Sequence, residues 1–120
     1  MAAPNIVGVT TIIAKVQGQV VTTTATAIVT NTAASGKVVK VNALIISNIN
    51  GTASADITAD VYKNQTTSYR LAFTVAVPND ATLVLLSKDT SVYLEENDSI
   101  RLTASANTYL EAVCSYEEIS

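Results

Sequence analysis

The chain has 120 residues, of which 48% are hydrophobic and only 14% are charged, and its formal net charge is −3. It contains no histidine and a single cysteine, which excludes a Cys–His nucleophile, the usual general base and an intrachain disulfide. A chain of this length forms one domain that can fold without a metal or a disulfide.

The charges are few and unevenly distributed. Residues 1–80 carry five Lys/Arg and three Asp/Glu, a net charge of +2. Residues 81–120 carry two Lys/Arg and seven Asp/Glu, a net charge of −5. We expect no nucleic-acid partner, because such binding needs a basic face, and no membrane partner, because no window approaches the ~20 apolar residues of a span. Unlike patches on neighbouring copies could attract one another, or the charges could lie in solvated loops. So few charges also favour a surface covered by partners, unless Thr, Ser and Asn suffice for solubility.

The first quarter of the chain predicts an arm and two strands. Residues 1–5, with Pro4, are expected to form an extended arm that either reaches a neighbour or frays. Strands are predicted at 6–16 and 20–30, with a turn at 17–19 between them. In the second strand Thr22, Thr24 and Thr26 are expected to share one face, which suits either solvent or a flat polar contact between subunits.

The most hydrophobic run is 37–47, and residues 43–46 lose all alternation. Such a loss indicates a strand that is central in a sheet or covered by an oligomer contact; the β-branched content disfavours the alternative of a short buried helix. Asn50 and Gly51 follow, a pair typical of turns with positive φ, so a hairpin is predicted between this strand and the next.

The middle of the chain alternates with a period of two, which predicts half-buried strands. Between 56 and 63, Ile57, Ala59 and Val61 are expected to face inward and Thr58, Asp60 and Tyr62 outward. Tyr69, Leu71, Phe73, Val75 and Val77 are expected to share one face of the strand that follows. Further strands are predicted at 82–87 and 91–94.

The last third, 92–119, has the clearest pattern. Ile100, Leu102 and Ala104 alternate with polar residues, and Cys114 shares a strand face with apolar neighbours, so we expect it to be a buried, inert thiol. With turn signals about every ten residues, the chain predicts an all-β fold: a single antiparallel β-sandwich or jelly-roll-like domain of about eight strands over 6–120.

No residue pattern predicts catalysis, a cofactor or a metal. The acidic cluster Glu95–Glu96–Asn97–Asp98 lacks the spaced ligands and the glycine of a calcium loop, so a turn is favoured, with Asn97 left-handed and Asp98 bonded to nearby backbone. Adjacent carboxylates on a strand point to opposite sides, which disfavours a glycosidase. The five tyrosines suit either an interface or the ends of a sandwich core.

Residues 68–120 contain several sequence features that are shared with a known family of proteins. Its features are the 69–73 strand, Pro78, a Leu-Leu-x-Lys-Asp turn at 85–89, Tyr-Leu-Glu at 93–95 and the closing Cys-Ser-Tyr-Glu-Glu at 114–118. On these the C-terminal half resembles small virion structural proteins of tailed phages, particularly those infecting marine cyanobacteria. Their acidic turn usually reads Glu-Gly-Asp; here Asn97 replaces the glycine, and asparagine tolerates positive φ next best. The resemblance implies a virion component with a β-sandwich or jelly-roll fold.

The resulting hypothesis is a non-enzymatic phage protein located in the virion and made in the host cytoplasm. We expect it to decorate or cement the capsid as a small homo-oligomer, a trimer, that binds the major capsid protein. The alternatives are a neck or tail accessory protein, such as a fibre-attachment base, and a receptor- or carbohydrate-binding module, which the shortage of aromatic residues disfavours. The interface residues predicted are Pro4, Ile6, Thr22, Thr24, Thr26, Leu44, Ile46 and Tyr62.

Overall fold

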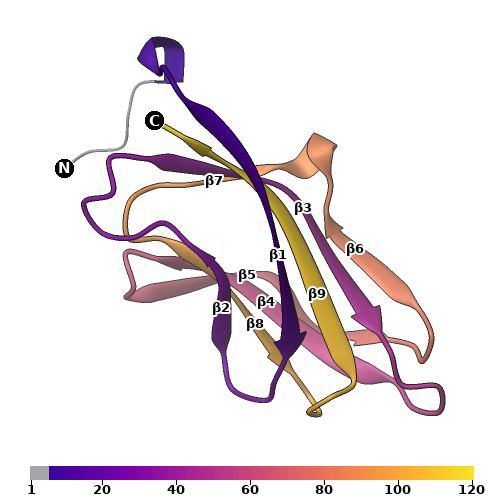
Figure 1. The fold of residues 1–120 in the computed structure, drawn as a ribbon. Coiled ribbons are helices and arrows are strands. Elements are labelled where there is room, and N and C mark those ends of the chain that lie inside the picture. The colour runs from indigo at the N-terminus through magenta and orange to yellow at the C-terminus, as the bar shows by residue number, and fades with distance from the viewer. Residues whose placement is uncertain (1–5) are drawn as a thin grey trace.

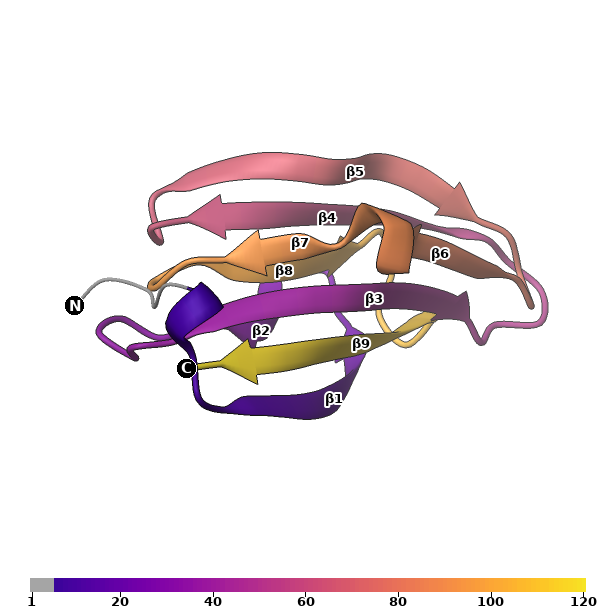
Figure 2. The same ribbon diagram turned by 90° about the horizontal axis from the view of Figure 1, so that it is seen from above.

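The computed structural model describes residues 6–120, which form two antiparallel β-sheets packed face to face (Figures 1 and 2). Two short 3-10 helices, η1 (Ile6–Gly8) and η2 (Lys88–Thr90), accompany the strands. The strands are β1 (Ile12–Val21), β2 (Thr26–Thr30), β3 (Val38–Asn48), β4 (Ala55–Lys63), β5 (Thr67–Val77), β6 (Thr82–Leu86), β7 (Val92–Leu94), β8 (Ser99–Ala104) and β9 (Leu110–Ile119).

The strand order identifies the architecture. Sheet A has the order β1-β9-β3-β6, with β7 also paired to β3, and sheet B has the order β2-β8-β4-β5. Because β6 and β7 pair with successive parts of β3, they act as one interrupted strand. The eight resulting strands are distributed between the two sheets in the order of a jelly roll, with β4 and β5 the consecutive pair that shares a sheet. The predicted all-β sandwich is therefore confirmed.

The core lies between the sheets and follows the predicted period of two. Ile100 and Leu102 of β8 and Leu110 of β9 are fully buried, while the residues between them are more exposed. The prediction of a central strand at 37–47 is also confirmed, since β3 is paired on both sides. Burial does alternate over 43–46: Leu44 and Ile46 are fully buried, whereas Ala43 and Ile45, on the other face of β3, are only partly covered. The apolar run therefore reflects apolar residues on both faces of the strand.

The start of the chain differs from the prediction. β1 begins at Ile12, and the predicted turn at 17–19 is wrong, because these residues continue the ladder to β9 without interruption. Gly18 pairs with Val113 inside this ladder. The chain instead turns at residues 22–25, between β1 and β2.

The predicted hairpin at Asn50 and Gly51 is also wrong. The strands on either side of it, β3 and β4, belong to different sheets, so this segment crosses the sandwich. Neither residue has a positive φ. Instead, the Asn50 side-chain oxygen accepts hydrogen bonds from the backbone N–H groups of Thr52 at 2.8 Å and Ala53 at 3.0 Å. Its side chain, and not a left-handed backbone, shapes the loop.

Strand β5, at one edge of sheet B, is irregular. Its pairing with β4 shifts register twice, and Thr74 has φ of 48°, which is unusual for a β-branched residue. The predicted shared face from Tyr69 to Val77 is therefore broken: Tyr69 pairs with an inward-facing residue of β4, and Phe73 falls in the bulge. Bulges of this kind make an edge strand a poor template for further pairing.

Candidate functional site

The predicted interface residues do not form one surface. Pro4 lies outside the described residues, and Ile6 belongs to η1 and not to the strand expected there. Leu44 and Ile46 are fully buried in the core of the single chain, so they are not available to a partner. Their apolar run reflects burial within the sandwich.

The threonine face is likewise not a strand face. Thr22 and Thr24 lie in the 22–25 turn, and only Thr26 belongs to β2. The Thr22 hydroxyl donates to the Thr24 carbonyl at 3.0 Å, and the Thr26 hydroxyl donates to the same carbonyl at 2.9 Å. These side chains stabilise the turn, which is a common use of hydroxyl residues in such positions.

Tyr62, the last predicted interface residue, belongs to a polar network on the outer face of sheet B. The Arg101 guanidinium lies 3.7 Å from the centroid of the Tyr62 ring. Its Nε and Nη2 donate to the two Asp60 carboxylate oxygens at 3.1 and 3.0 Å, and Nη2 also donates to the Ser68 hydroxyl at 2.6 Å. Hydrogen bonding to Asp60 raises the pKa of Arg101 despite the opposing effect of burial. The charged groups of Asp60 and Arg101 thus pair with each other within the chain, so no charge of this pair is left over for a partner.

The acidic turn has the predicted geometry. Asn97 has φ of 71°, and Asp98 is buried and accepts hydrogen bonds from the backbone N–H groups of Glu95 and Asn64 and from the Lys63 ammonium. Both carboxylate oxygens of Asp98 are thus occupied by protein donors. Within residues 6–120, no three side chains of the types that bind metals are grouped as a metal site requires.

Cys114 is fully buried in the core, as predicted. Burial raises the pKa of its thiol to about 11, so at neutral pH it is protonated and a poor nucleophile. It packs as a small apolar side chain.

The outer face of sheet A carries an exposed apolar surface that the sequence interpretation missed. One row of neighbouring residues crosses all four strands, from Gly18 on β1 through Val113 on β9 and Ile45 on β3 to Val84 on β6. Paired residues of adjacent strands point to the same side, so this row lies on one face. We call it, together with its neighbours on β1, the sheet A patch: Val16, Gly18, Val20, Ile45, Val84 and Val113.

The exposure of the sheet A patch is high for such residues. Val16 is 67% exposed, Val84 57%, Val20 49% and Val113 45%. Monomeric proteins expose scattered apolar side chains, but a contiguous apolar patch marks a contact surface. The signal was present in the alternation of Val16, Gly18 and Val20, but it was hidden by the expectation of a turn at Gly18.

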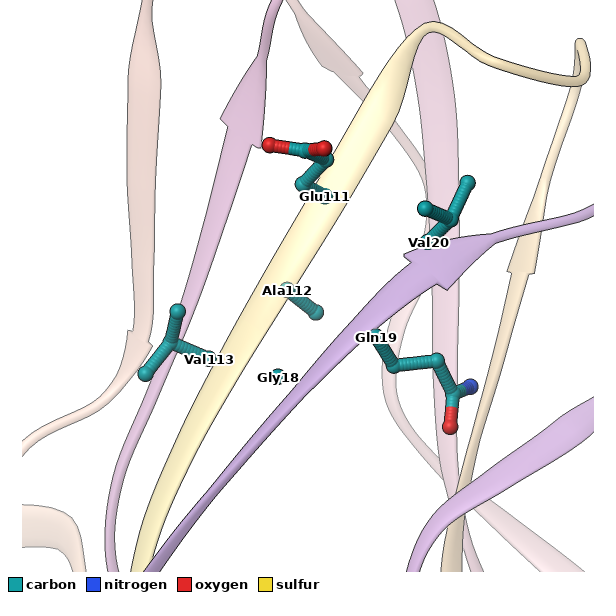
Figure 3. A pocket seen from close by; sticks show the side chains of 6 residues that line it. All are labelled: Gly18, Gln19, Val20, Glu111, Ala112 and Val113. Atoms are coloured by element: carbon teal, nitrogen blue, oxygen red, sulfur yellow. The ribbon is translucent and has the colours of Figure 1, made fainter.

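A shallow hollow of about 340 Å³ lies within the sheet A patch (Figure 3). It is formed where β1 and β9 run side by side, because Gly18 has no side chain between Val16 and Val20. A Cβ placed on Gly18 would have no atom within 4 Å. The lining residues are Gly18, Gln19, Val20, Glu111, Ala112 and Val113. The hollow offers apolar surface with one carboxylate at its border, which suits contact with an apolar side chain more than chemistry.

A second exposed apolar surface lies on β5, at the edge of the molecule opposite to β1 (Figure 2). Tyr69 and Phe73 are each 63% exposed, and Val75 is 38% exposed. The Arg70 guanidinium lies 5.3 Å from the centroid of the Phe73 ring. We call these four residues the β5 edge.

The far end of sheet A is polar. Glu118 of β9 makes ion pairs with Lys15 of β1 at 3.1 Å and with Lys37 at 3.3 Å. Burial raises the pKa of Glu118, but the hydrogen bonds and charges of the two lysines outweigh this effect and lower it overall. By the alternation of β1 and β9, Lys15 and Glu118 share the face of Cys114, so these ion pairs lie on the side of the sheet opposite to the sheet A patch.

No protein-family model matches the chain, and no curated protein matches it. In the described part of the chain, no helix has the length and apolar character that a membrane crossing would require. The case for a function therefore rests on the surfaces and on the resemblance of residues 68–120.

Proposed function

We propose that this chain is a non-enzymatic structural protein of a phage particle, which decorates or cements the capsid as a small homo-oligomer, with a trimer as the expected size. The observation that supports a role in assembly is the sheet A patch, an apolar row across four strands that would be covered in a complex. The particle itself is suggested by the resemblance of residues 68–120. The jelly-roll order is compatible with it, since the fold recurs in viral capsid proteins, although it also serves lectins and enzymes.

Binding in this proposal depends on apolar burial and repetition. Each buried Å² of apolar surface contributes about 25 cal/mol, so a patch of a few side chains gives a weak contact on its own. Copies joined in an oligomer engage a repetitive shell several times, and the combined affinity far exceeds that of one contact.

A neck or tail accessory protein would use the same surfaces but at a different copy number. A carbohydrate-binding module is less well supported, because none of the residues that line the hollow is aromatic, and sugar sites commonly use aromatic platforms. We therefore favour capsid decoration over these two alternatives.

Two measurements test the proposal. Light scattering and sedimentation of the purified chain at micromolar concentration should give an oligomer, and quantitative mass spectrometry of intact virions should give hundreds of copies. A stable monomer would contradict the proposed homo-oligomer. A handful of copies per particle would replace capsid decoration with the neck or tail role.

A further inference from the structure

We propose that copies of this chain join through two different surfaces: the β5 edge of one copy docks on the sheet A patch of the next, with Phe73 in the hollow at Gly18. The inference rests on the proposed homo-oligomer and specifies its contact. Three observations carry it: the shapes of the two surfaces, their charges and their positions on the chain.

The shapes are complementary. Phe73 stands in a bulge of β5 and is 63% exposed, so its ring projects from the edge. The hollow exists because Gly18 lacks a side chain beside Val20 and Val113, and its volume of about 340 Å³ has room for a phenyl ring. A ring held between two valines would bury much of the ~150–250 Å² that an aromatic side chain can bury.

The charges are complementary as well. Arg70 lies against the Phe73 ring, and Glu111 borders the hollow. Within residues 6–120, neither Arg70 nor Glu111 takes part in an ion pair. Lys40 and Lys88 also lack one, but Arg70 is the cation that accompanies Phe73. Docking Phe73 in the hollow brings a free cation toward a free carboxylate. The pairing of Arg70 with Glu111 would fix the orientation of the contact, because an arrangement that leaves a partly desolvated charge without its opposite charge is disfavoured.

The positions make the contact head-to-tail. Figure 2 shows β5 at one edge of the molecule and β1 at the other. Each copy thus presents one β5 edge and one hollow, and an unlike pair of surfaces produces a heterologous contact that repeats from copy to copy. The bulges of β5 also disfavour a contact by strand addition at that edge, which leaves its side chains to make it.

The first test fills the hollow. Gly18→Val adds a side chain where no atom lies within 4 Å and where a β-branched residue suits the strand, so the variant should melt at or above the wild-type temperature. Sedimentation equilibrium should show the dissociation constant of the oligomer raised at least tenfold. Gly8→Val is the matched control, because Gly8 also has open space but lies in η1, away from both surfaces; it should leave the constant unchanged.

The second test exchanges charges. Arg70→Glu and Glu111→Arg should each weaken association at least tenfold, and the double variant should recover it. Phe73→Ser should weaken association similarly, while Ile49→Ser, which changes a loop residue of comparable exposure (55% against 63%), should not. Rescue by the exchanged pair reports the contact itself and cannot arise from a loss of folding.

The outcomes separate the two proposals. A wild-type chain that stays monomeric contradicts the homo-oligomer, and this contact with it. A wild-type oligomer that persists unchanged in Gly18→Val and Arg70→Glu contradicts only the contact, and would point to another arrangement of the copies, such as pairing of two β1 edges.

Discussion

Replacing Asp98 with alanine should destabilise the fold far more than any other change to the acidic turn. Its side chain is only 2% exposed. One carboxylate oxygen accepts from the Asn64 N–H at 2.9 Å, and the other accepts from the Glu95 N–H at 3.1 Å and the Lys63 ammonium at 2.7 Å. Asp98 therefore ties the turn after β7 to the turn between β4 and β5.

The magnitude follows from these three donors. A hydrogen bond to a charged group contributes ~1.5–3 kcal/mol, and removing one partner leaves buried donors unsatisfied. Because Lys63 can turn to solvent, the two backbone N–H groups dominate, and Asp98→Ala should lower the free energy of unfolding by about 3–5 kcal/mol. For a domain of this size the melting temperature should fall by about 10–25 °C.

Urea and thermal denaturation followed by circular dichroism measure the effect. Asp98→Asn keeps the shape and one acceptor oxygen, so it should lose roughly half as much free energy as alanine. Glu95→Gln is the control: Glu95 is 74% exposed and 3.6 Å from Lys63, and its loss should cost no more than ~0.5 kcal/mol. If Asp98→Ala stayed within about 1 kcal/mol of the wild type, the reasoning about buried backbone donors would be refuted.

Four further predictions concern single residues: two members of ion pairs, one buried thiol and one strained backbone position. Glu118, whose pKa is lowered in the folded chain, stabilises the fold fully above its unfolded pKa of about 4.3, so the stability difference between wild type and Glu118→Gln should shrink as pH falls from about 6 to 3; a constant difference in urea titrations would contradict this. Cys114, with a pKa of about 11, should resist iodoacetamide at pH 8 in the folded chain and react in urea, and rapid labelling of the native chain would show that the thiol is accessible. Thr74→Gly removes a β-branched side chain at φ of 48° and should raise stability by ~0.5–1 kcal/mol in thermal melts, whereas a loss would mean that the residue is unstrained there. Arg101→Lys cannot reproduce the two-oxygen contact with Asp60 and should cost ~1–3 kcal/mol in the same assay, with no change expected only if the ion pair is dispensable.

The parts of the fold that could be predicted are those in which local pattern and burial agree. In β8, Ile100 and Leu102 alternate with polar residues, and in β9 Cys114 lies between the exposed Val113 and Ser115; all three side chains face the core. The left-handed turn at Asn97 could be predicted for a similar reason, since the residue types that favour it lie within 95–98, but the bonds of Asp98 to Lys63 and Asn64 could not. Here local sequence is sufficient because the structure is local or strictly periodic.

The wrong predictions of secondary structure occur where pairing with a strand far away in the sequence determines the local conformation. Gly18 suggested a turn, but pairing with Val113, 95 residues away in the chain, keeps it in a strand. Asn50 and Gly51 suggested a hairpin, but β9 pairs with one side of β3 and β6 and β7 pair with the other, so no place is left for β4 and the chain crosses to sheet B. Propensity at one position cannot anticipate a partner from the far end of the chain.

The candidate site was missed for the same reason. Val16, Val84 and Val113 come from three separate strands, and only the sheet brings them together. Leu44 and Ile46 were expected at an interface because their run is apolar on both sides, yet the second sheet covers them within one chain. Sequence can identify apolar residues, but it cannot tell internal burial from burial by a partner.

The place of β9 has a consequence for how the chain folds during synthesis. This strand is the last of residues 6–120 to leave the ribosome, and it is the strand that joins β1 to β3 in the middle of sheet A. Until β9 emerges, β1 has no strand to pair with in sheet A, and core residues such as Val21 of β1 stay exposed to solvent. Folds dominated by such long-range pairing form slowly. We therefore expect the sandwich to close only after β9 has left the ribosome, and ribosome-bound chains that stop before Leu110 to remain open to proteases and chaperones.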